Sequence, residues 1–223
     1  MIRYLAAAGV IAGSVSFAHS ANAGILLEES HSGMVDLQST NWSESLAVNQ
    51  FDDMDGARQL VSICIHLEGG VSGSAALESL DNAAAEVSVE LSAEISLSLG
   101  DALLGVLIPI ADDSFNASAF DGTIDFGGTS GMTFAKLEAS DSTDIKLTDA
   151  DESFASFIGD GTVKLTGDAV GTSFGAGAGN LVLQFTTQAE MSYRLTYKYT
   201  EIPTPGTAVL LAGAGLAGIR RRR

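Results

Sequence analysis

Clustered carboxylates beside a glycine are the first feature of this sequence that could support chemistry. Asp52, Asp53 and Asp55 lie in a short acidic run that ends at Gly56. Calcium binds several oxygen ligands from one loop, and aspartates before a turn glycine supply such oxygens. With Gly56 as the turn glycine, Ser62 occupies the position where an EF-hand has its bidentate glutamate, so the spacing is not that of an EF-hand. The run predicts a structural calcium site, with solvated acidic turns as the favoured alternative.

A thiol and an imidazole form the second candidate. Cys64 and His66 are two residues apart in an apolar run, so both would project from one face of a strand, where they could bind a metal or act as thiolate and base. The favoured alternative is a partly buried cysteine beside a surface histidine, because the chain has no second cysteine for a zinc site. His31 lies in a segment that reads as a loop, without a nucleophile pattern nearby.

The remaining polar residues have a simple explanation. Most of the acidic residues of the central segment fall at turns or on polar strand faces, where hydration explains them. Trp42 and the series Tyr193, Tyr197 and Tyr199 could line a sugar platform, but their alternating spacing favours core or edge packing. We therefore expect that the protein is not an enzyme and has no catalytic residue. Apart from the structural calcium, we expect no cofactor.

The charge of the chain constrains its partners. The 223 residues include 28 acidic and 11 basic ones, for a formal net charge of −17, and five of the basic residues are Arg3 and the four arginines at 220–223. The central segment is therefore strongly acidic, which repels nucleic acids and anionic lipids and attracts divalent cations, basic proteins or cationic polymers. We expect no nucleic-acid partner. The single cysteine excludes an intramolecular disulfide, so the fold depends on its own core.

Hydrophobic periodicity indicates strands. From Val87 to Leu99 every odd position is apolar and every even one is Ser or Glu, which is the pattern of a strand with one buried face. The pattern returns between Leu181 and Tyr199, over a length that fits two strands or one strand bent at a bulge. Shorter candidate strands cover 42–48, 60–67, 71–77, 103–110, 131–137, 143–148 and 162–166.

The breaks between these segments complete the fold prediction. Gly- and Asp-containing turns are expected at several places, among them Gly69-Gly70 and Gly167-Asp168, and short helices at 75–86 and 149–157. Because crossover helices are missing, the pattern predicts an all-β domain at 24–200, an antiparallel β-sandwich of jelly-roll or Greek-key kind.

The N-terminus has the layout of a signal peptide over residues 1–23. Arg3 is followed by an apolar run and then by Ala21 and Ala23 of an Ala-x-Ala cleavage site. We expect a signal helix, export through the Sec translocon, and cleavage after Ala23 by signal peptidase.

The C-terminal segment 201–223 has three parts. Pro203, Thr204 and Pro205 precede a Gly-, Ala- and Leu-rich run, and Arg220, Arg221, Arg222 and Arg223 follow it. The apolar run is short for a free-standing span, and the arginines would hold that end in the cytoplasm. This layout resembles the PEP-CTERM sorting signal, with Thr204 in place of the family's glutamate. The resemblance implies a short membrane helix that holds the protein transiently in the inner membrane, and processing by an exosortase-type membrane enzyme.

The central domain carries a second resemblance. The segments 41–52, 120–131 and 157–163 are similar to parts of the choice-of-anchor E domain, so the resemblance spans about residues 38–200. It implies an exported β-rich protein and no particular activity.

Together these features predict a cell-surface or extracellular-matrix protein with a structural or interaction role, with exopolysaccharide as one candidate partner. The alternative is a calcium- or carbohydrate-binding adhesion module of a biofilm matrix.

Overall fold

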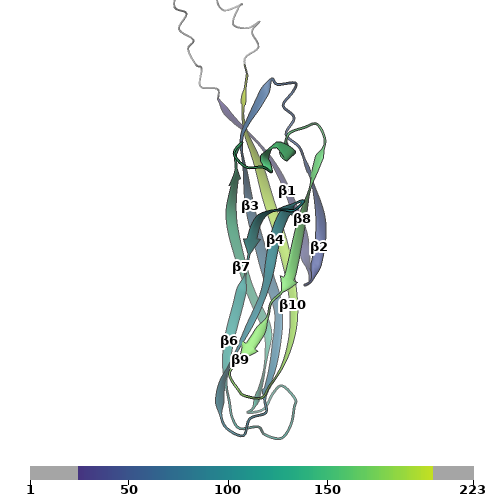
Figure 1. The fold of residues 1–223 in the computed structure, drawn as a ribbon. Helices are drawn as coiled ribbons and strands as arrows, with labels where there is room; N and C mark the ends of the chain where they lie inside the picture. The colour runs from purple at the N-terminus through teal and green to yellow at the C-terminus, as the bar shows by residue number, and fades with distance from the viewer. Residues whose placement is uncertain (1–24, 203–223) are drawn as a thin grey trace, which may run out of the picture.

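Two antiparallel sheets enclose one apolar core in the computed structural model, which describes residues 25–202 (Figure 1). The described residues form ten strands and one short 3-10 helix. In chain order these are β1 (Leu26–Ser39), β2 (Trp42–Asn49), β3 (Arg58–Ser79), β4 (Ala85–Leu99), β5 (Ala102–Leu107), β6 (Ile110–Ala117), β7 (Gly131–Leu147), η1 (Phe154–Phe157), β8 (Thr162–Gly171), β9 (Phe174–Ala176) and β10 (Leu181–Glu201).

The chain crosses several times between the two sheets. The first sheet has the order β1-β10-β3-β7, and the second has the order β2-β8-β4-β5, with β6 and β9 paired to the first half of β4. All of these strand pairs are antiparallel. Because β3 and β10 have 22 and 21 residues, the molecule is long and narrow, roughly 70 Å at the usual rise per residue (Figure 1). The all-β, antiparallel prediction is confirmed.

Strand alternation builds the core between the sheets. Val87, Leu91 and Ile95 of β4 have no exposed surface, while Glu90 and Glu94 point outward. The odd-numbered residues of β10 from 189 to 197 are likewise buried, so the predicted inward faces of both strands are confirmed.

Side-chain hydrogen bonds from Trp42 and Tyr197 join β2 of the second sheet to β10 of the first. The Trp42 indole nitrogen of β2 donates to the Ala189 carbonyl of β10 at 3.3 Å. This bond satisfies the polar atom of a buried aromatic residue and fixes the edge of the second sheet against the first.

The predicted turns at Gly69-Gly70 and Gly167-Asp168 are wrong. Gly69 and Gly70 lie inside β3, and Gly167 lies inside β8. A Cβ at Gly69 would come within 2.9 Å of Ile95 in the facing sheet, and one at Gly167 would overlap Met191. These glycines allow the two sheets to approach each other closely, which the local sequence does not distinguish from a turn.

Several strand boundaries also differ from the prediction. The two candidates at 60–67 and 71–77 are one strand, as are those at 131–137 and 143–148. The candidate at 103–110 is divided at Pro109, which has no N–H for the ladder. The segment 181–199 is a single strand with a register shift against β3 between Lys198 and Tyr199. The helix predicted at 75–86 is wrong, and only the 3-10 turn η1 forms within 149–157.

Strand β1 is not predicted by the hydrophobic pattern. Its inward positions include Glu29, His31 and Gly33, so apolar and polar residues do not alternate. His31 therefore lies in a strand, and its placement in a loop is wrong.

The predicted signal peptide with Ala21 and Ala23, and the predicted sorting tail from Pro203 to Arg223, lie outside the described residues. Between residues 25 and 202, no helix has the length and apolar character needed to cross a membrane.

Candidate functional site

The outer face of the first sheet carries a row of interacting polar side chains. Residues 63, 65 and 67 of β3 fill the core, so the even-numbered residues of this strand point away from it. His66 is directly opposite Asp144 of β7 on one side and Arg194 of β10 on the other. The strand register therefore brings together residues that are far apart in the sequence.

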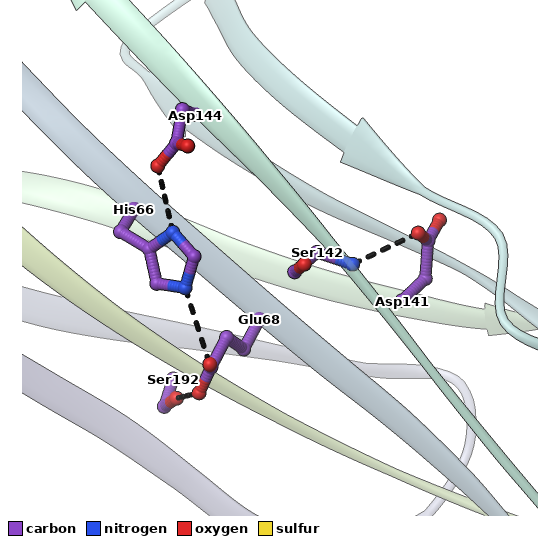
Figure 2. Close-up of polar contacts among 6 residues, drawn as sticks. All are labelled: His66, Glu68, Asp141, Ser142, Asp144 and Ser192. Atoms are coloured by element: carbon purple, nitrogen blue, oxygen red, sulfur yellow. Dashed lines mark hydrogen bonds and ion pairs between the residues drawn. The ribbon is translucent and has the colours of Figure 1, made fainter.

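His66 is held between two carboxylates (Figure 2). Its Nδ1 lies 2.7 Å from Asp144 Oδ1, and its Nε2 lies 3.1 Å from Glu68 Oε1. The Ser192 hydroxyl donates to the other oxygen of Glu68 at 3.4 Å. The hydrogen bond to Asp144, followed by the one to Glu68, raises the pKa of His66 above its usual value, because both carboxylates stabilise the protonated ring.

This arrangement is not that of a serine hydrolase. In a catalytic triad one histidine nitrogen faces an acid and the other faces the nucleophile. Here each ring nitrogen of His66 is hydrogen-bonded to a carboxylate, and the Ser192 hydroxyl donates to Glu68. Cys64 is half-buried on the same face, as its spacing predicts, and is opposite Lys146 and Thr196.

A groove of about 530 Å³ begins beside this cluster. Gly70 is part of its lining, and because this residue has no side chain, the Glu190 carboxylate can lie over the outer face of β3. Its lining includes Met34, Glu68, Ser140, Ser142, Glu190 and Ser192. A second hollow, which shares Met34, Glu68 and Ser192 with the groove, continues past His66 to Arg194 and Ser32. The two form a trough across all four strands of the sheet.

The predicted calcium residues lie elsewhere, in the loop before β3. Asp52 Oδ1 accepts the backbone N–H of Met54 at 2.8 Å, and Asp55 and Gly56 both have positive φ values, which make the tight turn. Within residues 25–202, no three His, Cys, Asp or Glu side chains are grouped closely enough to hold a metal ion. Calcium at Asp52, Asp53 and Asp55 stays a prediction.

The aromatic residues considered for a sugar platform face inward. Tyr193, Tyr197 and Trp42 are buried, and Tyr199 is partly buried against Phe51 at a ring distance of 5.1 Å. The core-packing interpretation of this series is therefore confirmed, and no sugar platform forms from these rings.

No protein-family model matches the chain, and no curated protein sequence matches it significantly. Among solved structures, it is similar to a chain in the structure of the infectious bursal disease virus Gx strain, with 11% identity over 81% of this chain and a TM-score of 0.14. A chain of the Gt strain gives 11% identity over 92% of this chain and a TM-score of 0.11. This chain spans 42% and 48% of the length of those two viral chains.

The polar residues that the fold brings together were not identified from the sequence as a group. Glu68, Asp144, Glu190 and Ser192 lie on three strands and are separated by up to 124 residues along the chain. Their one local signal is that each is a polar residue at an outward position of a strand. Many other residues of this acidic chain share that property, so the signal does not single them out.

Proposed function

We propose that this protein is an exported cell-surface or extracellular-matrix component with a structural or interaction role, delivered by signal-peptide export and exosortase-type sorting of its C-terminal tail. In this proposal the two sheets form a β-sandwich domain of jelly-roll or Greek-key kind, and the domain performs no catalysis.

The observation that carries the proposal is the pairing of the two outer ends of the described chain. Leu26 at the start of β1 is directly opposite Thr200 at the end of β10, so the two ends of the described chain lie at the same end of the molecule (Figure 1). A domain attached through its C-terminal tail would therefore be held by one end. In the sequence, the predicted cleavage site after Ala23 and the predicted sorting motif at Pro203 to Pro205 adjoin these two chain ends.

The opposite end would then project away from the attachment point. The start of β10 pairs with the end of β3, since Leu181 is opposite Ser79, and the loop between β6 and β7 also lies there. The length of the long strands places this end roughly 70 Å from the base. A narrow domain held by its base and strongly acidic along its length suits a surface or matrix component, because like charge keeps neighbouring copies apart.

Fractionation and intact mass of the protein from a host with an exosortase test this proposal. The native chain should begin at Gly24, end within 203–206 and leave the inner membrane. A variant without Arg220 to Arg223 should keep its tail and fail to reach the surface. As a matched control, Lys136→Gln removes one exposed cation from β7 and should be sorted normally. A native chain that keeps its tail in the inner membrane would contradict the proposal.

The alternative of a carbohydrate-binding adhesion module is supported by a separate observation, the polar trough across the outer face of the first sheet. Its hydroxyl and carboxylate groups are hydrogen-bonding partners for sugar hydroxyls. Because the trough lies between the two ends, it would remain accessible on a domain that is held by its base.

A further inference from the structure

We propose that the trough on the outer face of the first sheet binds a linear polysaccharide that carries free amino groups, with Glu190 as the partner of a sugar ammonium. This inference rests on the carbohydrate-binding alternative above and names its ligand class. It does not depend on how the protein reaches the surface.

Three features of the sheet create the trough at Glu190. Gly70 is opposite Glu190 in the β3–β10 pair, and a Cβ on Gly70 would meet the Glu190 carboxylate at 3.0 Å. The carboxylate therefore lies over the backbone of β3. On the other side, the β1–β10 register shifts between Val35 and Gln38, so Asp36 and Leu37 together oppose Glu190 as a bulge. Bulges bend an edge strand and redirect side chains, which opens the sheet surface at this point.

The third feature is the small size of the residues on β7. Ser140 is opposite Gly70, and Ser142 is opposite Glu68, so the β7 side of the trough presents hydroxyl groups in place of bulky side chains. Ser192 of β10 adds a further hydroxyl group. Met34 of β1, which is 63% exposed, supplies an apolar surface at the other side. A sugar ring has hydroxyl groups at its rim and C–H groups on its faces, and the trough offers partners for both.

The carboxylates of the trough differ in their partners. Glu68 is already hydrogen-bonded through both oxygens, to His66 and Ser192. Glu190 is exposed and has no Lys, Arg or His nitrogen within 4.0 Å among the described residues. It is thus an available acceptor, and a charged donor makes a stronger bond to it than a hydroxyl does.

The charge of the surroundings selects a cationic ligand. Among the residues that line the trough, Glu68, Asp141 and Glu190 outnumber His66 and Arg194. His66 is also paired with Asp144, and the whole chain carries a formal charge of −17. An acidic polysaccharide would be repelled by this field, whereas a polymer with ammonium groups would be attracted.

A basic peptide is disfavoured by the position of the trough. The centre of the trough lies over β3 and β10, which are paired on both sides, so the backbone groups there are not free to add a peptide strand. Its serine hydroxyls fit sugar hydroxyl groups better than a peptide with few side-chain hydroxyls. A lysine peptide is therefore included in the test as the competing ligand.

Calorimetric titration of the full chain in mild detergent tests the inference, with a glucosamine hexamer, its fully N-acetylated form, a galacturonate hexamer and hexalysine as probes. The glucosamine hexamer should bind about tenfold more tightly than the acetylated one, as expected for one additional charge-assisted hydrogen bond. Glu190→Gln should abolish that preference, and Glu94→Gln on the outer face of β4 should keep it. The galacturonate hexamer should give no heat.

Equal affinity for the two glucosamine forms would overturn the inference, and so would an equal loss of affinity in the two variants. It would also be overturned if hexalysine bound as tightly as the glucosamine hexamer, with the same dependence on Glu190. Correct sorting of a protein that fails this titration would reject the ligand and leave the proposed delivery intact. Binding by a protein that is not sorted would support the ligand and reject the proposed delivery.

Discussion

Ser130 donates a 2.6 Å hydrogen bond to Glu78, a carboxylate without any exposed surface at the end of β3. The backbone N–H of Phe126 donates to the other oxygen of Glu78 at 2.8 Å, and the Ser79 N–H donates to the Ser130 carbonyl at 2.9 Å. A buried carboxylate is costly unless it is hydrogen-bonded, so these contacts fix the β6–β7 loop to the sheet.

Removing the Ser130 hydroxyl should therefore destabilise the protein. Ser130→Ala leaves the buried Glu78 with one donor fewer, which should lower the free energy of unfolding by about 1–3 kcal/mol. Urea denaturation followed by circular dichroism measures the change. Ser118→Ala in the same loop, at an exposed position, is the control and should be neutral. Equal stability of both variants would show that Glu78 does not depend on the Ser130 hydroxyl.

The Tyr197 hydroxyl should stabilise the contact between the sheets. It donates to the Asn49 carbonyl at 2.7 Å, and burial, with smaller effects of Glu29 and Tyr193, raises the pKa of Tyr197, so it remains a donor in the neutral range. Tyr197→Phe should cost about 1 kcal/mol in urea denaturation. Tyr199→Phe is the matched control, since the Tyr199 hydroxyl has no hydrogen bond to the described residues. A larger loss from the control would contradict the assignment.

The network around His66 should make stability depend on pH. Because the folded pKa is raised above 6.5, the unfolded value, the stabilisation is complete below that pH and is lost as the pH rises through the folded pKa. NMR titration of the imidazole should show a lower pKa in Asp144→Asn than in the native chain, and a smaller decrease in Glu68→Gln. Glu94→Gln should leave the titration unchanged. A His66 pKa that is the same in Asp144→Asn would contradict the geometry.

Gly73 of β3 should tolerate no side chain. A Cβ there would overlap the Thr186 carbonyl oxygen of β10, and a backbone atom in a paired strand cannot move aside. Gly73→Ala should therefore cost about 1–3 kcal/mol through overpacking. At Gly70 the nearest atoms belong to the flexible Glu190 side chain, so Gly70→Ala should cost less. Thermal unfolding of the two variants side by side measures the difference, and the reverse order would contradict the explanation.

The sequence by itself determined the fold class and the inward faces of β4 and β10. Alternation with a period of two is a local property of the chain, so Val87, Leu91 and Ile95 were correctly placed in the core without knowledge of any partner strand. The same reasoning placed Tyr193 and Tyr197 in the core.

Only the tertiary structure decided which residues meet. Whether a glycine makes a turn or allows a close contact depends on the facing strand, so the local sequence predicts a turn at Gly69 and Gly70 although both lie within β3. The contact between His66 and Asp144 depends on the register of β3 against β7, and the exposure of Glu190 depends on a bulge in β1. Register and bulges are set by pairing between distant segments, and such pairing leaves no periodic signal in either segment alone.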